Sequence, residues 1–133
     1  MIKYDLKSNS LPRLSRAPES SEIEKSKAFN LADVGQFVSE GLTVNTILKE
    51  ATGDIRLASL TAHFIWAEKI TPCDIFFQII DGNAEVTIGE KIHSLLVGQA
   101  IIVPAHSGYS IRTNHSCKML VTIIKSGYEK VIA

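Results

Sequence analysis

Apolar residues in the middle of the chain come in short blocks separated by glycines. Between Asp81 and Ser110 the glycines stand at positions 82, 89, 98 and 108, and the blocks between them consist mainly of aliphatic and β-branched residues. Blocks of this length between turn-forming residues are typical of antiparallel strands joined by tight turns, not of helices. The pattern therefore predicts a β-barrel or a β-sandwich.

The strand pattern continues on both sides of this stretch. Residues 42–49 alternate loosely between apolar and polar positions, residues 51–54 supply a turn, and residues 55–66 form a long second strand. Pro72 places a loop or an edge crossing at residues 68–73, because proline lacks the N–H that a strand interior donates. Further strands are predicted at residues 74–80, 84–88, 91–95, 99–103, 109–113 and 117–125. About eight short antiparallel strands in this order indicate an all-β jelly roll.

The length and composition of the chain indicate one domain with an N-terminal arm. A chain of 133 residues can bury one core but is too short for two barrels. Residues 1–27 are rich in Ser, Lys and Glu and show no hydrophobic period, so they are predicted to form an arm that packs on the barrel or on a partner subunit. Residues 28–133 form the barrel domain, which begins with one helical turn over residues 31–34 capped by Asn30.

The charge balance gives no indication of a polyanionic partner. Lys and Arg number 14, Asp and Glu number 14, and the formal net charge is +0. Nucleic acid and anionic membranes are therefore not predicted as partners. The first residues lack the apolar segment of a signal peptide, and no stretch is apolar enough to cross a bilayer, so a cytoplasmic location is expected. In that compartment Cys73 and Cys117 are two reduced thiols.

Two glycine-containing motifs resemble those of a known family. Gly98 and Pro104 have the spacing of the second cupin motif, and Gly82, after the apolar run of residues 75–80, resembles the glycine that ends the first. The likeness extends over residues 29–125, since the flanks of this region also resemble small single-domain cupins. The resemblance implies an RmlC-like jelly-roll barrel and a homodimer.

The resemblance also implies that the usual metal site is lost. Cupins typically hold a divalent metal with two histidines and a glutamate from the first motif and one histidine from the second. The glutamate position falls on Ile75, and the window for its paired histidine falls on residues 68–71. The second-motif histidine position falls on Tyr109. Because metal sites need deprotonated nitrogen, oxygen or sulfur donors, the resemblance implies a metal-free barrel with no cofactor.

A substitute metal site is the alternative to a metal-free barrel. It would be built from His63, His106 and Asp74, with Tyr109 beside them. Strand alternation opposes a role for Asp74, because neighbouring residues of a strand point to opposite faces, and Asp74 points outward if Ile75 points inward. The metal-free interpretation is therefore favoured.

A barrel without a metal still offers an interior site for a small molecule. If Ile75 faces inward, as the resemblance implies, Phe77 shares its face. The candidate ligand-binding residues of the interior are Lys69, Tyr109, Phe77, His63 and Trp66. The positive charge of Lys69 repels a metal and attracts an anionic ligand such as a carboxylate. The structural alternatives, a solvated Lys69 with Tyr109 and Trp66 as packing residues, stay open.

No catalytic set is evident in the sequence. No serine lies in a nucleophile-elbow glycine pattern, and no phosphate-binding glycine loop ends in Lys-Ser or Lys-Thr. The favoured hypothesis is a metal-independent homodimeric module that binds or senses a small molecule. One alternative is a metal-dependent cupin enzyme of the dioxygenase or isomerase type with an altered ligand set. The other is a structural or interaction subunit whose barrel is filled by side chains.

Overall fold

The computed structural model describes residues 23–35, 37 and 40–125, and residues 1–22 of the predicted arm lie outside this range. Nine strands account for most of the described chain, and its single helical element is a 3₁₀ turn, η1. No helix in the described part of the chain is long and apolar enough to span a membrane. The elements are η1 Leu31–Asp33, β1 Leu42–Glu50, β2 Gly53–Leu60, β3 Ile65–Lys69, β4 Asp74–Asp81, β5 Ala84–Ile88, β6 Lys91–Leu95, β7 Ala100–Val103, β8 Tyr109–Arg112 and β9 Cys117–Ile124.

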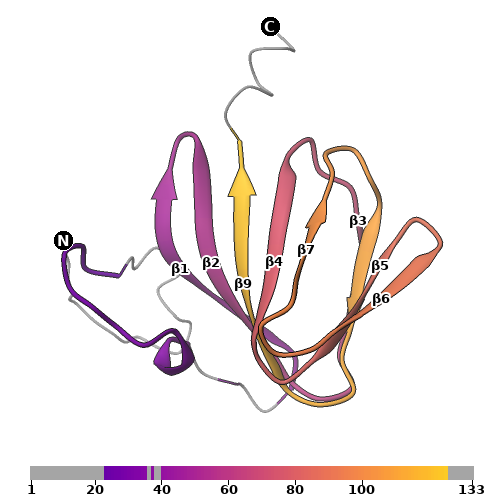
Figure 1. Cartoon of the computed structure of the whole chain (residues 1–133), viewed down its shortest axis with the longest axis horizontal. Helices are drawn as coiled ribbons and strands as arrows, with labels where there is room; N and C mark the ends of the chain where they lie inside the picture. The colour runs from indigo at the N-terminus through magenta and orange to yellow at the C-terminus, as the bar shows by residue number, and fades with distance from the viewer. Residues whose placement is uncertain (1–22, 36, 38–39, 126–133) are drawn as a thin grey trace, which may run out of the picture.

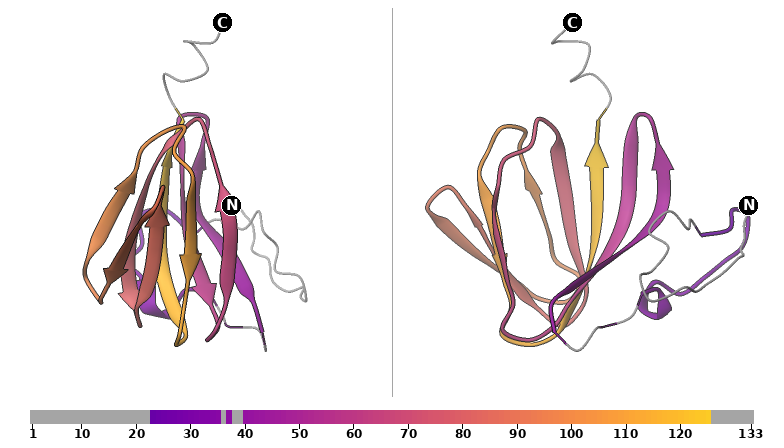
Figure 2. Two further views of the ribbon diagram at one scale, coloured as in Figure 1. Left: turned by 90° about the vertical axis from the view of Figure 1, so that its right-hand side faces the viewer. Right: turned by 180° about the vertical axis from the view of Figure 1, so that it is seen from behind.

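The strands form two antiparallel sheets that pack into a sandwich (Figures 1 and 2). One sheet has five strands in the order β1-β2-β9-β4-β7, and the other has four in the order β3-β8-β5-β6. Neighbours in the sheets are often distant in sequence, as when β9 inserts between β2 and β4. This is the predicted jelly-roll architecture, with nine strands where the sequence indicated about eight.

Side chains on the inward faces of the sheets form one hydrophobic core. Along β4, Ile75, Phe77 and Ile79 are 2%, 0% and 1% exposed, whereas Phe76 and Gln78 between them are half-buried. The alternation confirms the inward face expected for Ile75, because side chains of a strand point to opposite faces in turn. The other strands complete the core with Ala58, Leu60, Val86, Val103, Ile111, Met119 and Val121.

The prediction of one long strand over residues 55–66 is wrong. β2 and β3 belong to different sheets, and residues 61–64 form the turn between them. The Thr113 hydroxyl holds this turn, since it donates to the Thr61 carbonyl at 2.7 Å and accepts from the Phe64 N–H at 3.0 Å. His63 has a φ of 59°, a left-handed conformation that is uncommon outside glycine. A threonine 49 residues away thus fixes the turn, where the sequence has no glycine or proline.

The loop predicted over residues 68–73 begins too early. β3 continues to Lys69, although its pairing with β8 is irregular after Trp66. The last pair of this ladder joins Lys69 to Tyr109. The strand end therefore brings together two of the residues proposed for the barrel interior.

Residues 31–35 lie on the outer face of the five-stranded sheet. The helical turn predicted from Asn30 is confirmed as η1, and the Asn30 side chain accepts a hydrogen bond from the Ala32 N–H at 3.4 Å. The ammonium of Lys118, a buried residue of β9, donates to the carbonyl of Ala32 at 2.6 Å and to that of Val34 at 3.2 Å. It also lies 5.5 Å from the ring centre of Phe37. Lys118 thus satisfies carbonyls at the end of the turn that have no partner within it.

Candidate functional site

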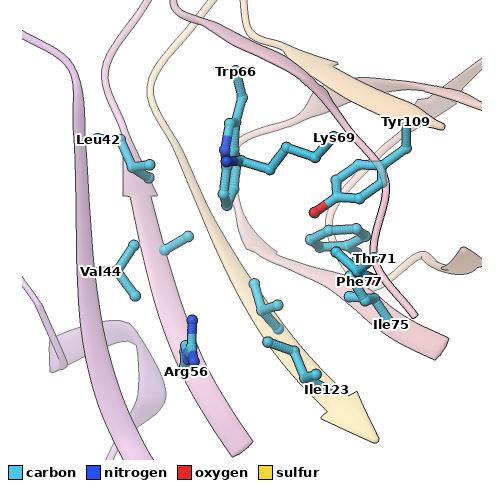
Figure 3. Close-up of a pocket in the computed structure, with 12 residues that line it drawn as sticks. Leu42, Val44, Arg56, Trp66, Lys69, Thr71, Ile75, Phe77, Tyr109 and Ile123 are labelled. Atoms are coloured by element: carbon cyan, nitrogen blue, oxygen red, sulfur yellow. The ribbon is translucent and has the colours of Figure 1, made fainter. Parts of the chain in front are cut away.

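A cavity of about 330 Å³ lies between the two sheets (Figure 3). Its size is near the lower end of the range for small-molecule pockets, so it accommodates a small organic molecule. The lining combines side chains from β1, β2, β3, β4, β8 and β9 with one residue from the loop before β4. The lining residues are Leu42, Val44, Arg56, Ala58, Trp66, Lys69, Thr71, Ile75, Phe77, Tyr109, Val121 and Ile123.

Strand alternation places the apolar part of this lining. Residues two apart on a strand share a face, and three strands of the five-stranded sheet each contribute a pair of apolar residues spaced in this way. β4 contributes Ile75 and Phe77, β9 contributes Val121 and Ile123, and β1 contributes Leu42 and Val44. The five-stranded sheet therefore supplies a largely apolar floor, and the few polar groups of the cavity stand out against it.

Lys69 and Tyr109 form a polar pair on the opposite, four-stranded sheet. They are cross-strand partners, and their amine and hydroxyl both point into the cavity (Figure 3). The Tyr109 ring packs against Phe77 with ring centres 5.6 Å apart and planes tilted by 56°, a favourable aromatic geometry. Burial raises the pKa of the Tyr109 hydroxyl above its ordinary value of 10.0. At neutral pH this group is therefore a neutral hydrogen-bond donor or acceptor.

Arg56 is a site residue that the sequence interpretation missed. It lies on β2 two residues from Ala58, and both line the cavity. Its Nη2 donates to Asp54 Oδ2 at 2.7 Å, and Lys125 Nζ lies 3.0 Å from the same oxygen. The Asp54 side chain is 0% exposed, whereas that of Arg56 is 38% exposed. Asp54 therefore holds Arg56 through Nη2 while leaving other guanidinium N–H groups available.

The ionic contacts fix the charge of Asp54. Burial by itself would raise the pKa of this carboxyl, but hydrogen bonds and charge interactions with Arg56 and Lys125 outweigh it, so the pKa lies below the ordinary 3.8. Asp54 is therefore ionised at neutral pH. Its charge is shared between two cations, and none of the described residues that line the cavity is acidic.

Acid should weaken the fold through Asp54. A lowered pKa in the folded state adds stability above the pKa of the unfolded chain, near 3.9, and that stability is lost as the pH falls toward the folded value. We expect Asp54→Asn to lower the free energy of unfolding by about 1–3 kcal/mol at pH 7, because hydrogen bonds to charged groups have this magnitude. The deficit should shrink in urea unfolding at pH 3.

A surface carboxylate provides the control for this pH dependence. Glu90 is exposed in the turn between β5 and β6, so Glu90→Gln should change stability by no more than about 0.5 kcal/mol at either pH. If the deficit of Asp54→Asn stayed constant between pH 7 and pH 3, the ionic role assigned to Asp54 would be wrong.

The structure brings together four of the five residues proposed for the interior. Lys69, Tyr109, Phe77 and Trp66 line the cavity. His63 does not, because it lies exposed in the turn before β3. The expectation that His63 faces the interior is therefore wrong, and it failed because the residue was assigned to the middle of a continuous strand.

The substitute metal-binding set is not assembled. His106 is exposed in the loop after β7, where its backbone N–H donates to the Thr71 carbonyl at 2.7 Å. Asp74 Oδ1 accepts a hydrogen bond from the Ala105 N–H at 2.7 Å, so this carboxylate holds the loop. In the described ranges, no three side chains of His, Cys, Asp or Glu gather as a metal-binding group. His63, His106 and Asp74 thus do not form a common site.

The architecture defines a two-sheet jelly-roll domain with an internal pocket. Comparison with known proteins shows which fold this is. No model of a known protein family and no curated protein matches the chain. Solved structures do match over most of its length. A conserved protein of unknown function from Streptococcus pyogenes is 23% identical with a TM-score of 0.72, over 77% of this chain and 90% of that one.

Two further structures carry the name of the fold. A cupin superfamily protein from Desulfitobacterium hafniense is 20% identical, with a TM-score of 0.72 over 77% of this chain and 94% of that one. The cupin domain of Cnp3 from Schizosaccharomyces pombe is 19% identical, with a TM-score of 0.69 over 79% of this chain and 78% of that one. The chain therefore has the cupin fold, which confirms the fold that the two glycine motifs predicted.

Proposed function

We propose that this cupin-fold protein binds a small anionic molecule in the cavity between its sheets, without using a metal ion. The observation that carries the proposal is the composition of the lining: Arg56 and Lys69 supply positive charge, and no acidic residue of the described part of the chain lines the cavity. Charged groups bordering an apolar cavity interact more strongly with a ligand charge than they would in water.

The residues at the positions that hold metal ligands in typical cupins support the metal-independent part of the proposal. Ile75, which takes the glutamate position, has no donor atom, and Lys69 lies in the window of the paired histidine with a positive charge. Tyr109 has a pKa raised by burial, so deprotonation to the phenolate that would bind a metal is disfavoured. A molecule with a carboxylate suits these groups better than a cation does.

The experiment compares carboxylates with neutral amides of the same shape. Hexanoate and benzoate should raise the melting temperature with EDTA present, whereas hexanamide and benzamide should not. A ligand at about 100 times its dissociation constant stabilises the folded state by about 2.7 kcal/mol. Lys69→Met should remove most of this stabilisation, because it keeps the length of the side chain but not its charge.

Lys91→Met is the matched control, since Lys91 is an exposed lysine of β6 that does not line the cavity. It should leave the carboxylate effect unchanged. Equal stabilisation by the amides, or stabilisation that needs an added divalent metal, would refute the proposal. The second result would favour the metal-dependent enzyme instead. The homodimer predicted from the resemblance stays a prediction.

A further inference from the structure

The two cations of the cavity come from opposite sheets. Arg56 belongs to β2 of the five-stranded sheet, and Lys69 ends β3 of the four-stranded sheet. Figure 3 draws the Arg56 guanidinium and the Lys69 amine at different places in the cavity. A ligand that reaches both cations therefore has to span the space between the sheets.

The charges around the cavity do not balance. Arg56 and Lys125 share the single carboxylate oxygen Oδ2 of Asp54, so three charged groups there carry a surplus of one positive charge. Lys69 forms no salt bridge with any residue of the described chain. The surplus is therefore one positive charge at each of two separate places, and a ligand with one anionic group leaves one of them uncompensated.

Apart from Arg56, the side chains that the five-stranded sheet contributes to the lining are apolar. Ala58, Val121 and Ile123 line the cavity on the five-stranded sheet, and Phe77 lies on the side toward Tyr109. Burying a polar group here without a partner is unfavourable, whereas methylene groups gain from burial. The middle of a matching ligand is therefore hydrocarbon.

We propose that the preferred ligand class is a small dicarboxylate with an apolar middle, held by Arg56 at one end and by Lys69 at the other. The inference rests on the proposed function, because it assigns a ligand class to the same cavity. Arg56 contributes N–H groups that Asp54 does not use, in the planar arrangement that suits a carboxylate. Beside Lys69, the hydroxyl of Tyr109 is a further donor that lines the cavity.

The test compares two probes of equal length by isothermal titration calorimetry. Adipate and hexanoate both have six carbon atoms and differ in the second carboxylate. We expect adipate to bind about tenfold more tightly or better, because hydrogen bonds to charged groups contribute at this level. Arg56→Gln should remove the advantage of adipate while hexanoate, held through Lys69, binds nearly as before. Lys69→Met should weaken both probes.

Lys125→Met is the matched control for Arg56→Gln. Both variants remove one positive charge and one of the cations that contact Asp54, but only Arg56 lines the cavity. Lys125→Met removes the surplus charge but no group that contacts the ligand, so it should reduce the preference for adipate clearly less than Arg56→Gln does. Melting temperatures of both variants establish that they fold.

The possible outcomes distinguish this inference from the function on which it rests. If adipate and hexanoate bind equally and Lys69→Met weakens both, anion binding stands and the dicarboxylate assignment is wrong. If Arg56→Gln still bound adipate more tightly than hexanoate, the assignment of one carboxylate to Arg56 would also be wrong. If neither probe binds the native protein, the proposed function itself fails.

Discussion

Replacing Gly82 with alanine is expected to lower the free energy of unfolding by more than about 3 kcal/mol. Gly82 follows β4 with a φ of +80°, where an L-residue is strained by about 1–2 kcal/mol. In addition, a Cβ atom at this position would overlap the backbone carbonyl oxygen of Ser116 and lie 3.0 Å from Cα of Cys117. Both atoms belong to the backbone at the start of β9, so relief requires a shift of a central strand. Urea unfolding measures the loss.

Gly89 provides a matched control for the overlap. It also sits in a hairpin turn with a positive φ, +63°, but no atom lies within 4 Å of the position its Cβ would take. Gly89→Ala should therefore cost only the conformational part, about 1–2 kcal/mol. Equal losses in the two variants would show that conformation alone explains Gly82, and the close approach to Ser116 would then have no energetic effect.

The difference between these glycines shows what the sequence revealed and what it left out. Spacing was enough to predict turns at both positions, because glycine tolerates a positive φ that tight turns require. Only the fold shows that Gly82 also lies against the chain near Ser116, which is distant in sequence. Local turn chemistry is therefore predictable, whereas close approaches between distant segments are not.

The strand predictions also succeeded where local sequence marks the strand ends and failed where a distant residue sets them. β4 was placed correctly because the apolar run of residues 75–80 stands between Pro72 and Gly82, which mark its ends in the sequence. The break between β2 and β3 was missed because the hydroxyl of Thr113, just after the neighbouring strand β8, fixes it and no local turn residue marks it. The error carried over to His63, which a continuous strand placed in the interior and the turn places outside.

Two of the polar residues of the cavity, Lys69 and Tyr109, were predicted from the sequence, and a third, Arg56, was not. Lys69 and Tyr109 could be proposed because the resemblance to known motifs assigned them to positions that face the interior, and both line the cavity. Arg56 has no counterpart in those motifs. Its inward direction depends on the register of β2, whose partner β1 carries a shift in pairing between Thr46 and Leu48. A charged pair two residues apart, with Asp54 at the end of the predicted turn and Arg56 at the start of the predicted strand, was the signal available in the sequence.

Replacing Phe77 with alanine is expected to have the largest effect in the core. Phe77 is 0% exposed, packs against Tyr109 and forms part of the cavity wall. Truncating a fully buried phenylalanine costs about 3–5 kcal/mol, because transfer energy is lost and the surroundings close the space only in part. We expect a loss of this size in urea unfolding, together with weaker binding of hexanoate, since the apolar wall that contacts it recedes.

Phe76→Ala is the matched control, because it removes the same group from the opposite face of the same strand. Phe76 is half-buried on the outer face and does not line the cavity. It should cost clearly less stability, about 1–2 kcal/mol, since less apolar area returns to water. Hexanoate binding should be unchanged. If Phe76→Ala weakened hexanoate binding as much as Phe77→Ala did, the ligand would lie on the outer face of the five-stranded sheet and not between the sheets.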